Sequence, residues 1–249
     1  MSGHSKWSTI KRKKAATDAA RGKVFTKYIR EITLAARAGG GDPDANPRLR
    51  TAISGAKSVN MPVANIERAV QKGTGQLEGS VIEEVTYEGY GPHGVAILVE
   101  CATDNRNRAT GDVRHAFSKY GGNMGEAGSV SYLFKPRGVL TVALDAATED
   151  TVMEVALEAG AEDIVTGAEA YEITTPVAAL EPVREALLAR GVSVSSAEAT
   201  KIASVHVPLG EKEAPSVLRL VGILEDLDDV QQVYANFDIP DEVLAKLSH

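Results

Sequence analysis

Short motifs that could hold a phosphate or a metal ion are the first features to test in this chain of 249 residues. Gly22-Lys23 resembles the end of a phosphate-binding loop, but Val24 stands where such a loop needs a serine or threonine. The segment Asp42–Asn46 begins like a calcium-binding loop, but Pro47 replaces the glycine that such a loop requires. Asp, Asn and Pro all favour turns, so we expect a turn rather than a metal site here.

Catalytic groupings of side chains are also missing from the sequence. Asp112 and His115 fall on one helical face and could form a carboxylate–imidazole pair, but other charged residues share that face, so we expect an ordinary solvated surface. Ser129 and Ser131 lack the motif that surrounds a serine nucleophile. The five histidines are scattered without the spacing of zinc ligands: His4, His93, His115, His206 and His249. The sequence therefore predicts no enzyme, no cofactor, no metal and no small-molecule substrate.

Positive charge is concentrated at the N-terminal end of the chain. Residues 1–80 contain 15 Lys and Arg against 6 Asp and Glu, whereas residues 137–249 contain 7 against 21, and the whole chain has a net charge of −7. Lys and Arg that meet phosphates release condensed cations, so this distribution favours a nucleic acid, either duplex DNA or ribosomal RNA, as the partner. We expect the following residues to bind it: Lys6, Trp7, Lys11, Arg12, Lys13, Lys14, Arg21, Lys23, Lys27 and Arg30.

Other interpretations of the basic segment stay open. Trp7 beside Lys6 offers a flat ring on which a base could stack, but a basic run can also be a solvated face or bind a protein. An acid-poor N-terminus can also be a targeting peptide. The segment Val24–Ala36 argues against removal of such a peptide, because it has the apolar spacing of a helix that belongs to a core.

The cysteine content and hydropathy favour a reducing compartment. Cys101 is the only cysteine, which excludes an intrachain disulfide, and it lies in an apolar run where a buried thiol is expected. No apolar stretch approaches the ~20 residues that span a bilayer, and residues 1–7 lack the apolar core of a secretory signal. We therefore expect a cytoplasmic protein without a membrane partner.

An amphipathic helix must position the later basic residues. Thr17 or Asp18 caps it, the glycines 39–41 end it, and an apolar stripe follows one side from Val24 to Ala36. Four cations lie on the other side, where we expect them to face solvent as a uniformly positive arc: Lys23, Lys27, Arg30 and Arg37. Residues 6–16 contain few apolar groups, so we expect a partner to order them.

Two shorter helices complete a small bundle in the predicted fold. Asn46 caps the first of them, which starts at Pro47 and ends near Asn60. Pro62 opens the second and Gly73 closes it. We expect its apolar side to point inward through three residues: Val63, Ile66 and Val70.

Strand patterns begin at about residue 80. We expect strands over 84–88 and 95–102, a helix from Asp104 or Asn105 to Tyr120, a flexible loop over 121–128 and a strand over 129–134. Strands and helices then follow in the order of the split βαβ, or ferredoxin-like, fold, at 138–144, 149–159, 163–166, 170–174, 179–190 and 192–199. A helix over 215–227 and a strand over 230–236 would complete the sheet that begins at residue 81.

The fold class that we predict is α+β with three domains. A small basic helical bundle takes residues 1–79, and a middle α+β domain takes residues 80–136 and 204–249. An acidic ferredoxin-like α+β domain, inserted into the middle one, takes residues 137–203. The acidic domains repel polyanions, which leaves them available for the ribosome or other proteins.

A series of motifs keeps its order along the whole chain and is densest over residues 1–135. It includes Met1-Ser-Gly-His-Ser-Lys-Trp7, Arg21-Gly-Lys-Val-Phe-Thr-Lys27, Asn46-Pro-Arg-Leu-Arg50, Lys72-Gly-Thr-Gly75, Tyr87-Glu-Gly-Tyr-Gly-Pro92 and Thr103-Asp-Asn-Arg-Asn-Arg108. This series resembles the YebC/PmpR family. The resemblance implies a helical bundle with two α+β domains, one inserted in the other, in a cytoplasmic bacterial protein described as a probable transcriptional regulator that binds promoter DNA.

Two functions fit these observations. The first is a non-enzymatic, DNA-binding regulator of transcription. The alternative is a ribosome-associated translation factor whose basic segment meets ribosomal RNA. The resemblance allows it, since some relatives activate the synthesis of cytochrome oxidase in mitochondria or relieve stalled ribosomes. The lack of a convincing helix-turn-helix spacing favours this alternative.

Overall fold

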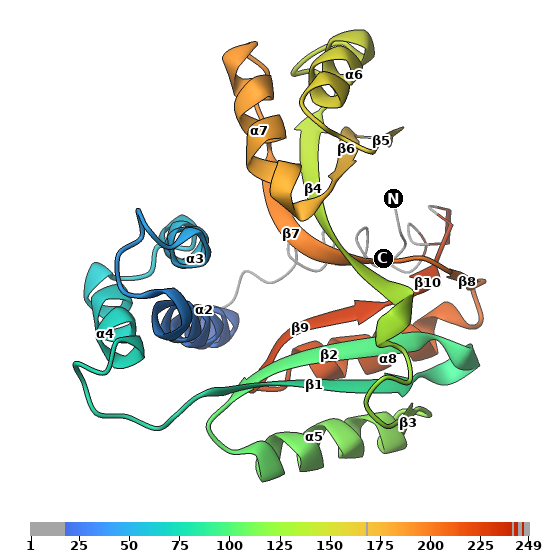
Figure 1. Ribbon diagram of the computed structural model, residues 1–249. Coiled ribbons are helices and arrows are strands. Elements are labelled where there is room, and N and C mark those ends of the chain that lie inside the picture. The colour runs from blue at the N-terminus through green and yellow to red at the C-terminus, as the bar shows by residue number, and fades with distance from the viewer. Residues whose placement is uncertain (1–17, 168, 241, 244–245, 247–249) are drawn as a thin grey trace.

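The computed structural model describes residues 18–240 except 168, together with 242, 243 and 246, and it describes side chains from residue 22 onward. Figure 1 shows three groups of elements: the helices α2–α4, a first sheet with helices α5 and α8, and a second sheet with helices α6 and α7. Both four-stranded sheets are antiparallel throughout. The structure therefore confirms the α+β class.

The helical unit, as we name the first group, consists of α2 (Asp18–Gly39), α3 (Pro47–Ser58) and α4 (Val63–Gly73). Asn46 caps α3 as predicted, because its side-chain oxygen accepts a hydrogen bond from the Leu49 amide at 3.1 Å. Its side-chain nitrogen donates to the carbonyls of Ala35 at 2.8 Å and Gly40 at 2.9 Å. One buried amide group thus joins the end of α2 to the start of α3.

The inward side of α4 differs from the prediction at one residue. Ile66 is buried, but Val63 is 61% exposed. Val63 is the first residue of α4, whereas the contact with α2 lies further along, where the Thr33 hydroxyl donates to the Ala69 carbonyl at 3.3 Å. Met61, two residues before α4 begins, is buried in this core instead.

The first sheet contains β1 (Glu83–Tyr90), β2 (Ala96–Thr103), β3 (Asn123–Met124) and β9 (Val230–Ala235), in the order β3-β1-β2-β9. Helices α5 (Arg106–Lys119) and α8 (Ala214–Glu225) cover one face. Side chains alternate along β2, so that Ile97 and Val99 pack against the helices while Leu98 faces the other way. Because β9 pairs with β2, the chain returns from the second sheet to complete the first, as predicted.

The second sheet contains β4 (Phe134–Ala143), β5 (Asp163–Thr166), β6 (Ala170–Thr175) and β7 (Ser196–Ala203), in the order β5-β6-β4-β7. Helices α6 (Glu149–Glu158) and α7 (Leu180–Ala189) share a core with it. The order of elements is the predicted split βαβ order. The exact domain boundaries stay a prediction. The short elements are η1 (Pro92–Gly94), η2 (Ser131–Leu133), η3 (Val177–Ala179), β8 (Val207–Pro208) and β10 (Phe237–Asp238).

The prediction of a strand over residues 129–134 is wrong. The segment forms η2, and only its last residue, Phe134, begins a strand. The buried carboxylate of Glu88 accepts hydrogen bonds at 2.7 Å from three backbone amides, two in this segment and one just before it. The donors are Gly128, Val130 and Ser131. Amides that bond a carboxylate are not available to a neighbouring strand, so most of the segment stays outside the sheet.

The structure differs from the predicted elements at two further places. The predicted flexible loop over 121–128 contains β3, which pairs with β1. The last strand of the second sheet starts at Ser196 rather than at Val192. The chain turns at Gly191, which has a φ of +78°, and the side chain of Val192 then fills the core before pairing begins.

Candidate nucleic-acid interface

The basic side of α2 faces the rest of the protein. Lys23 Nζ and Lys27 Nζ each donate a 3.0 Å hydrogen bond to a carbonyl at the end of α8, and Arg30 donates to a carbonyl slightly further on. The accepting residues are Asp226, Glu225 and Asp228, in that order. The last carbonyls of a helix lack partners within it and carry the negative end of its dipole, so cations stabilise them. The prediction that this arc faces solvent is therefore wrong for Lys27 and Arg30, which are half-buried, whereas Lys23 stays exposed although it bonds the protein.

Asp229 is the second anion in this contact. It is 5% exposed, and its Oδ1 lies 2.9 Å from Arg30 Nη2. Arg108 of α5 donates to the same carboxylate at 2.9 and 3.1 Å and to Asp104 at 2.8 Å. The hydrogen bonds to Asp229 and Asp104 raise the pKa of Arg108, and the one to Arg108 lowers the pKa of Asp104. We call the set formed by Lys23, Lys27, Arg30 and residues 225–229 the α2–α8 contact.

Other links between the helical unit and the first sheet are also polar. Arg48 of α3 donates to Glu31 of α2 at 2.8 and 3.1 Å and to Glu84 of β1 at 2.6 Å. The hydrogen bonds to these two carboxylates raise the pKa of Arg48, although burial opposes them. Arg37, the fourth cation of the predicted arc, is exposed and donates to the Ile82 carbonyl at 2.6 Å.

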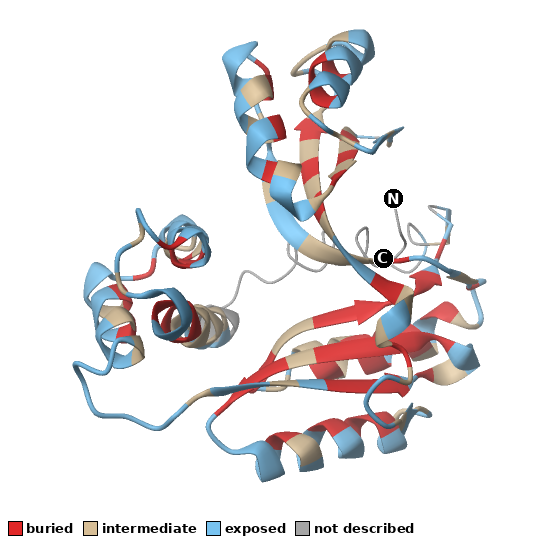
Figure 2. Cartoon of the chain, in the orientation of Figure 1, coloured by how far each residue is buried: buried red, intermediate tan, exposed pale blue. Residues whose placement is uncertain are grey.

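Four further cations of the helical unit lie exposed on α3 and α4. They are Arg50, Lys57, Arg68 and Lys72. Within the part of the chain that the structure describes, none of the four forms an ion pair. Arg68 and Lys72 are four residues apart, so they are neighbours on one side of α4, and Figure 2 shows the outer sides of α3 and α4 as exposed. Arg50 donates to the carbonyls of Pro43 and Asp44, both at 3.4 Å. Exposed cations without a carboxylate partner are available to phosphates.

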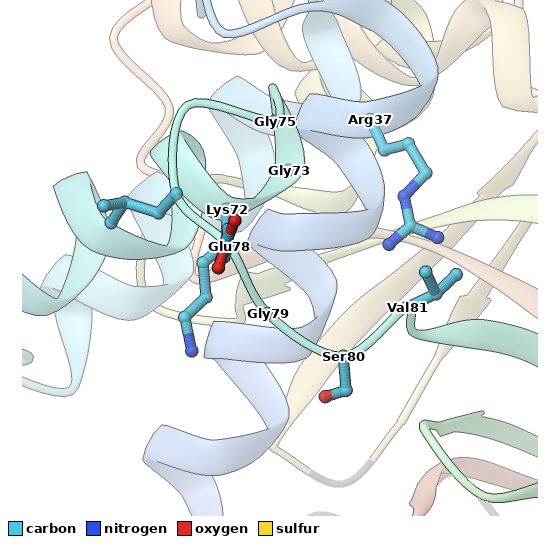
Figure 3. Close-up of a pocket in the computed structure, with 9 residues that line it drawn as sticks. Arg37, Lys72, Gly73, Gly75, Glu78, Gly79, Ser80 and Val81 are labelled. Carbon is cyan, nitrogen blue, oxygen red and sulfur yellow. The ribbon is translucent and has the colours of Figure 1, made fainter.

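An open cavity of about 630 Å³ lies beside Lys72. Figure 3 shows Arg37 and Lys72 beside the segment that leads from α4 to β1. The lining residues are Arg37, Lys72, Gly73, Gly75, Leu77, Glu78, Gly79, Ser80 and Val81. Two cations against one carboxylate leave an excess of positive charge, which suits an anion such as a phosphate.

The structure describes only part of the predicted site. Of the residues expected to bind nucleic acid, it brings together Lys23, Lys27 and Arg30 at the end of α8. Arg21 lies in α2, but its side chain is outside the described residues, as are Lys6, Trp7, Lys11, Arg12, Lys13 and Lys14, and also the predicted cap Thr17. Sequence reasoning missed the acceptor side of the contact, although the acidic run Glu225–Asp229 at the end of a predicted helix was a usable signal.

Side chains of the types that bind a metal ion or react as a base or nucleophile also lie within the described residues. No group of His, Cys, Asp or Glu side chains there could hold a metal ion. Asp112 and His115 are both exposed, as expected for a solvated surface. Burial raises the pKa of Cys101 to about 12, so the thiol stays protonated at neutral pH. None of the described helices has the length and the apolar character needed to cross a bilayer.

These features define a class: an α+β protein in which a basic helical unit is held against a larger acidic body by polar contacts. The chain belongs to the TACO1/YebC family. A model described as the TACO1/YebC protein N-terminal domain matches residues 5–76, and one described as the TACO1/YebC second and third domain matches residues 82–237.

Curated relatives and a solved structure agree with this assignment. The chain is 56% identical over 249 residues to a probable transcriptional regulatory protein of Sulfurihydrogenibium, with 99% of each chain covered. It is 58% identical over 247 residues to one of Geobacter sulfurreducens, covering 99% of this chain and all of that one. The crystal structure of a conserved hypothetical protein, Aq1575 from Aquifex aeolicus, is 51% identical, with a TM-score of 0.81, and covers 91% of this chain and 94% of that one. The relatives are thus named as regulators of transcription.

Proposed function

We propose that this protein is a non-enzymatic regulator of gene expression that binds duplex DNA through its basic N-terminal part. The observation that carries the proposal is the separation of charge, with 15 cations against 6 anions in residues 1–80 and 7 against 21 in residues 137–249. The four exposed cations on α3 and α4, which form no ion pair among the described residues, and the names of the relatives support it. Such a regulator acts in the cytoplasm, where Cys101 stays reduced.

The cations have different roles in this proposal. Lys6, Arg21 and the run Lys11–Lys14 contact phosphates, and Trp7 stacks on or beside a base. The exposed cations of α3 and α4 extend the same positive surface. Phosphate contacts give affinity and orientation, so the choice of target sequence requires further contacts with base edges. The acidic second sheet and its helices point away from DNA and stay available for a protein partner.

Charge reversal in the basic run tests the proposal. The variant combines Lys11→Glu, Arg12→Glu, Lys13→Glu and Lys14→Glu. If about six phosphates are contacted, the slope of log K against log salt is about −5 for the unaltered chain, and loss of four contacts flattens it by about 3 to 4. Binding is measured by the fluorescence anisotropy of a labelled duplex. Circular dichroism checks that the variant is folded.

A matched control has the same change of charge at another place. It reverses four cations that lie outside the helical unit: Lys135, Arg190, Lys212 and Lys246. The proposal expects the control to keep the slope of the unaltered chain. Equal weakening by both variants would mean that only the overall charge matters, and unchanged binding by the Lys11–Lys14 variant would place the interface elsewhere.

Ribosomal RNA is the competing target, because phosphate contacts do not distinguish the two nucleic acids. Sedimentation of the protein with ribosomes at physiological salt, with duplex DNA added as a competitor, separates the possibilities. Release from ribosomes by an equal mass of duplex supports DNA as the target. Retention on ribosomes would replace the transcriptional proposal with a function in translation.

A further inference from the structure

The α2–α8 contact places cations of the proposed binding surface against internal anions. Arg30 is the clearest case, because its side chain is only 15% exposed and its guanidinium bonds both the Asp228 carbonyl and the Asp229 carboxylate. A carboxylate offers two oxygens to an arginine in the same way that a phosphate does. A phosphate therefore cannot reach Arg30 while Asp229 holds it.

The contact contains few apolar groups that would hold it closed. The buried core of the helical unit and that of the first sheet share no residue. A cavity of about 300 Å³ lies between them, lined by Gly22, Lys23, Thr26, Lys27, Arg30, Leu227 and Asp228. Competing ions weaken the exposed members of such a contact most and its buried pair less, whereas they would not weaken a merged apolar core.

The covalent connection also permits movement of the helical unit. Residues 74–82 join α4 to β1, and they are exposed or half-buried along their length. The segment contains two glycines, of which Gly75 has a φ of +78°. Near this segment, Arg48 bonds the Glu84 carboxylate of β1, and Arg37 bonds the carbonyl of Ile82 at the end of the segment itself. Both are again charged groups on oxygen acceptors.

We infer that nucleic-acid phosphates and the end of α8 compete for the same cations, so that binding of nucleic acid separates the helical unit from the first sheet. The inference rests on the proposed function and adds a way in which the affinity for nucleic acid is regulated. In the arrangement that the structure shows, which we call the closed form, Asp229 and the carbonyls at the end of α8 bond Lys23, Lys27 and Arg30. In the open form these cations join the phosphate-binding surface. The closed contact therefore lowers the affinity for nucleic acid.

A pair of neighbouring substitutions isolates the contact. Asp229→Asn keeps the size of the side chain and removes the charge that holds Arg30. Asp228→Asn removes the same charge one residue earlier and keeps the backbone carbonyl that bonds Arg30. The Asp228 side chain is exposed and forms no ion pair among the described residues. We expect Asp229→Asn to raise the affinity for a duplex about 5-fold and to steepen the salt slope by about 1. Asp228→Asn should change the affinity by less than about 2-fold, the range of a surface charge.

The separation itself is measured by energy transfer between dyes on the helical unit and on α5. Gln71→Cys and Ser118→Cys supply exposed attachment sites, and the buried Cys101 reacts slowly with dyes because burial raises its pKa. We expect added duplex, or Asp229→Asn alone, to lower the transfer efficiency. Since Asp229 also bonds Arg108 and its variant could be less stable, the double variant Lys23→Gln and Lys27→Gln provides an independent test. It should lower the transfer without raising the affinity.

The outcomes separate this inference from the proposed function. If the duplex binds but neither the transfer nor the affinity distinguishes Asp229→Asn from Asp228→Asn, the competition is refuted while DNA binding stands. If the duplex does not bind but inorganic polyphosphate still lowers the transfer, the competition stands and the proposed function is refuted. Transfer that stays constant in polyphosphate, in duplex and in both contact variants overturns the inference.

Discussion

The first sheet is joined to the second sheet and to the helical unit by two different kinds of contact. Toward the second sheet, an apolar cluster joins the two parts, and two strands, β4 and β7, carry the chain across. Its buried members are Ala96, Leu98, Val130, Phe134, Ala203 and Tyr234. Toward the helical unit, the bonds are made by Lys and Arg side chains, and a single connecting segment, residues 74–82, carries the chain.

This difference indicates which part of the molecule responds to its surroundings. Burial of apolar groups is insensitive to moderate salt, whereas charges are screened over about 10 Å at 0.1 M salt. The second sheet is joined to the first by the apolar cluster and also by an ion pair between Lys201 and Glu100, so we expect it to respond less to salt than the helical unit does. The helical unit is held by forces that a polyanion or added salt weakens, and this unit carries the cations proposed to bind nucleic acid.

The largest change in stability is expected in the apolar cluster between the two sheets. Phe134 is 6% exposed, and its ring centroid lies 6.4 Å from that of Tyr234. Phe134→Ala should lower the free energy of unfolding by about 3 kcal/mol, because a large buried side chain leaves a cavity. Urea denaturation at low and at high salt measures it, and the loss should be the same at both. If the free energy of unfolding fell by less than about 1 kcal/mol, the apolar cluster would not be the stronger of the two contacts.

A smaller effect is expected at Glu88, which fixes the loop that enters the second sheet. Burial alone would raise the pKa of Glu88, but hydrogen bonds from the amides of Gly128, Val130 and Ser131 outweigh it and lower the pKa. Glu88→Gln should cost about 2 kcal/mol at pH 7, the scale of a hydrogen bond to a charged group.

The same substitution has an expected pH dependence. A lowered pKa in the folded protein means that the carboxylate stabilises the fold above the ordinary pKa of a glutamate, about 4.3. That stability is lost as the pH falls through the lower pKa of the folded state. The difference between the unaltered chain and Glu88→Gln in urea denaturation should therefore shrink below about pH 4. A difference that grows with acid would contradict the assignment.

The smallest change in stability is expected for the polar contact between the helical unit and the first sheet. Arg48 is 41% exposed in its side chain, and it joins Glu31 to Glu84. Arg48→Gln should cost about 0.5 kcal/mol in low salt, the scale of an exposed ion pair, and less in high salt. Arg50→Gln, which removes a cation without an ion pair among the described residues, is the matched control and should cost less. A salt-independent loss of more than about 2 kcal/mol at Arg48 would place this contact in the same category as the apolar one.

Local signals in the sequence predicted most of the fold correctly. Asn46 followed by Pro47 identified the start of α3, because an N-cap depends only on residues within one turn. The apolar run from Val95 to Ala102 identified a buried strand, and β2 is buried along almost all of its length. The predicted position of the last strand, beside the first sheet, followed from the split βαβ order in between.

Long-range partners explain what the sequence did not predict. The loop before β4 depends on Glu88, which lies about 40 residues earlier and reads as an exposed residue of an alternating strand. Lys23 and Arg30 bond groups about 200 residues away, and a charge pattern cannot distinguish a cation that binds a phosphate from one that binds a helix end. Val63 fits the helical stripe, but only the packing shows that Val63 is exposed while Met61 is buried.

The salt dependence of duplex binding by the unaltered chain tests the central claim most directly. The anisotropy of a labelled duplex is titrated with the protein at several salt concentrations between about 50 and 200 mM. The account predicts tight binding at the lowest salt and a slope of log K against log salt of about −5. Absence of binding, or a slope near zero, would contradict a cationic N-terminal part that binds phosphates.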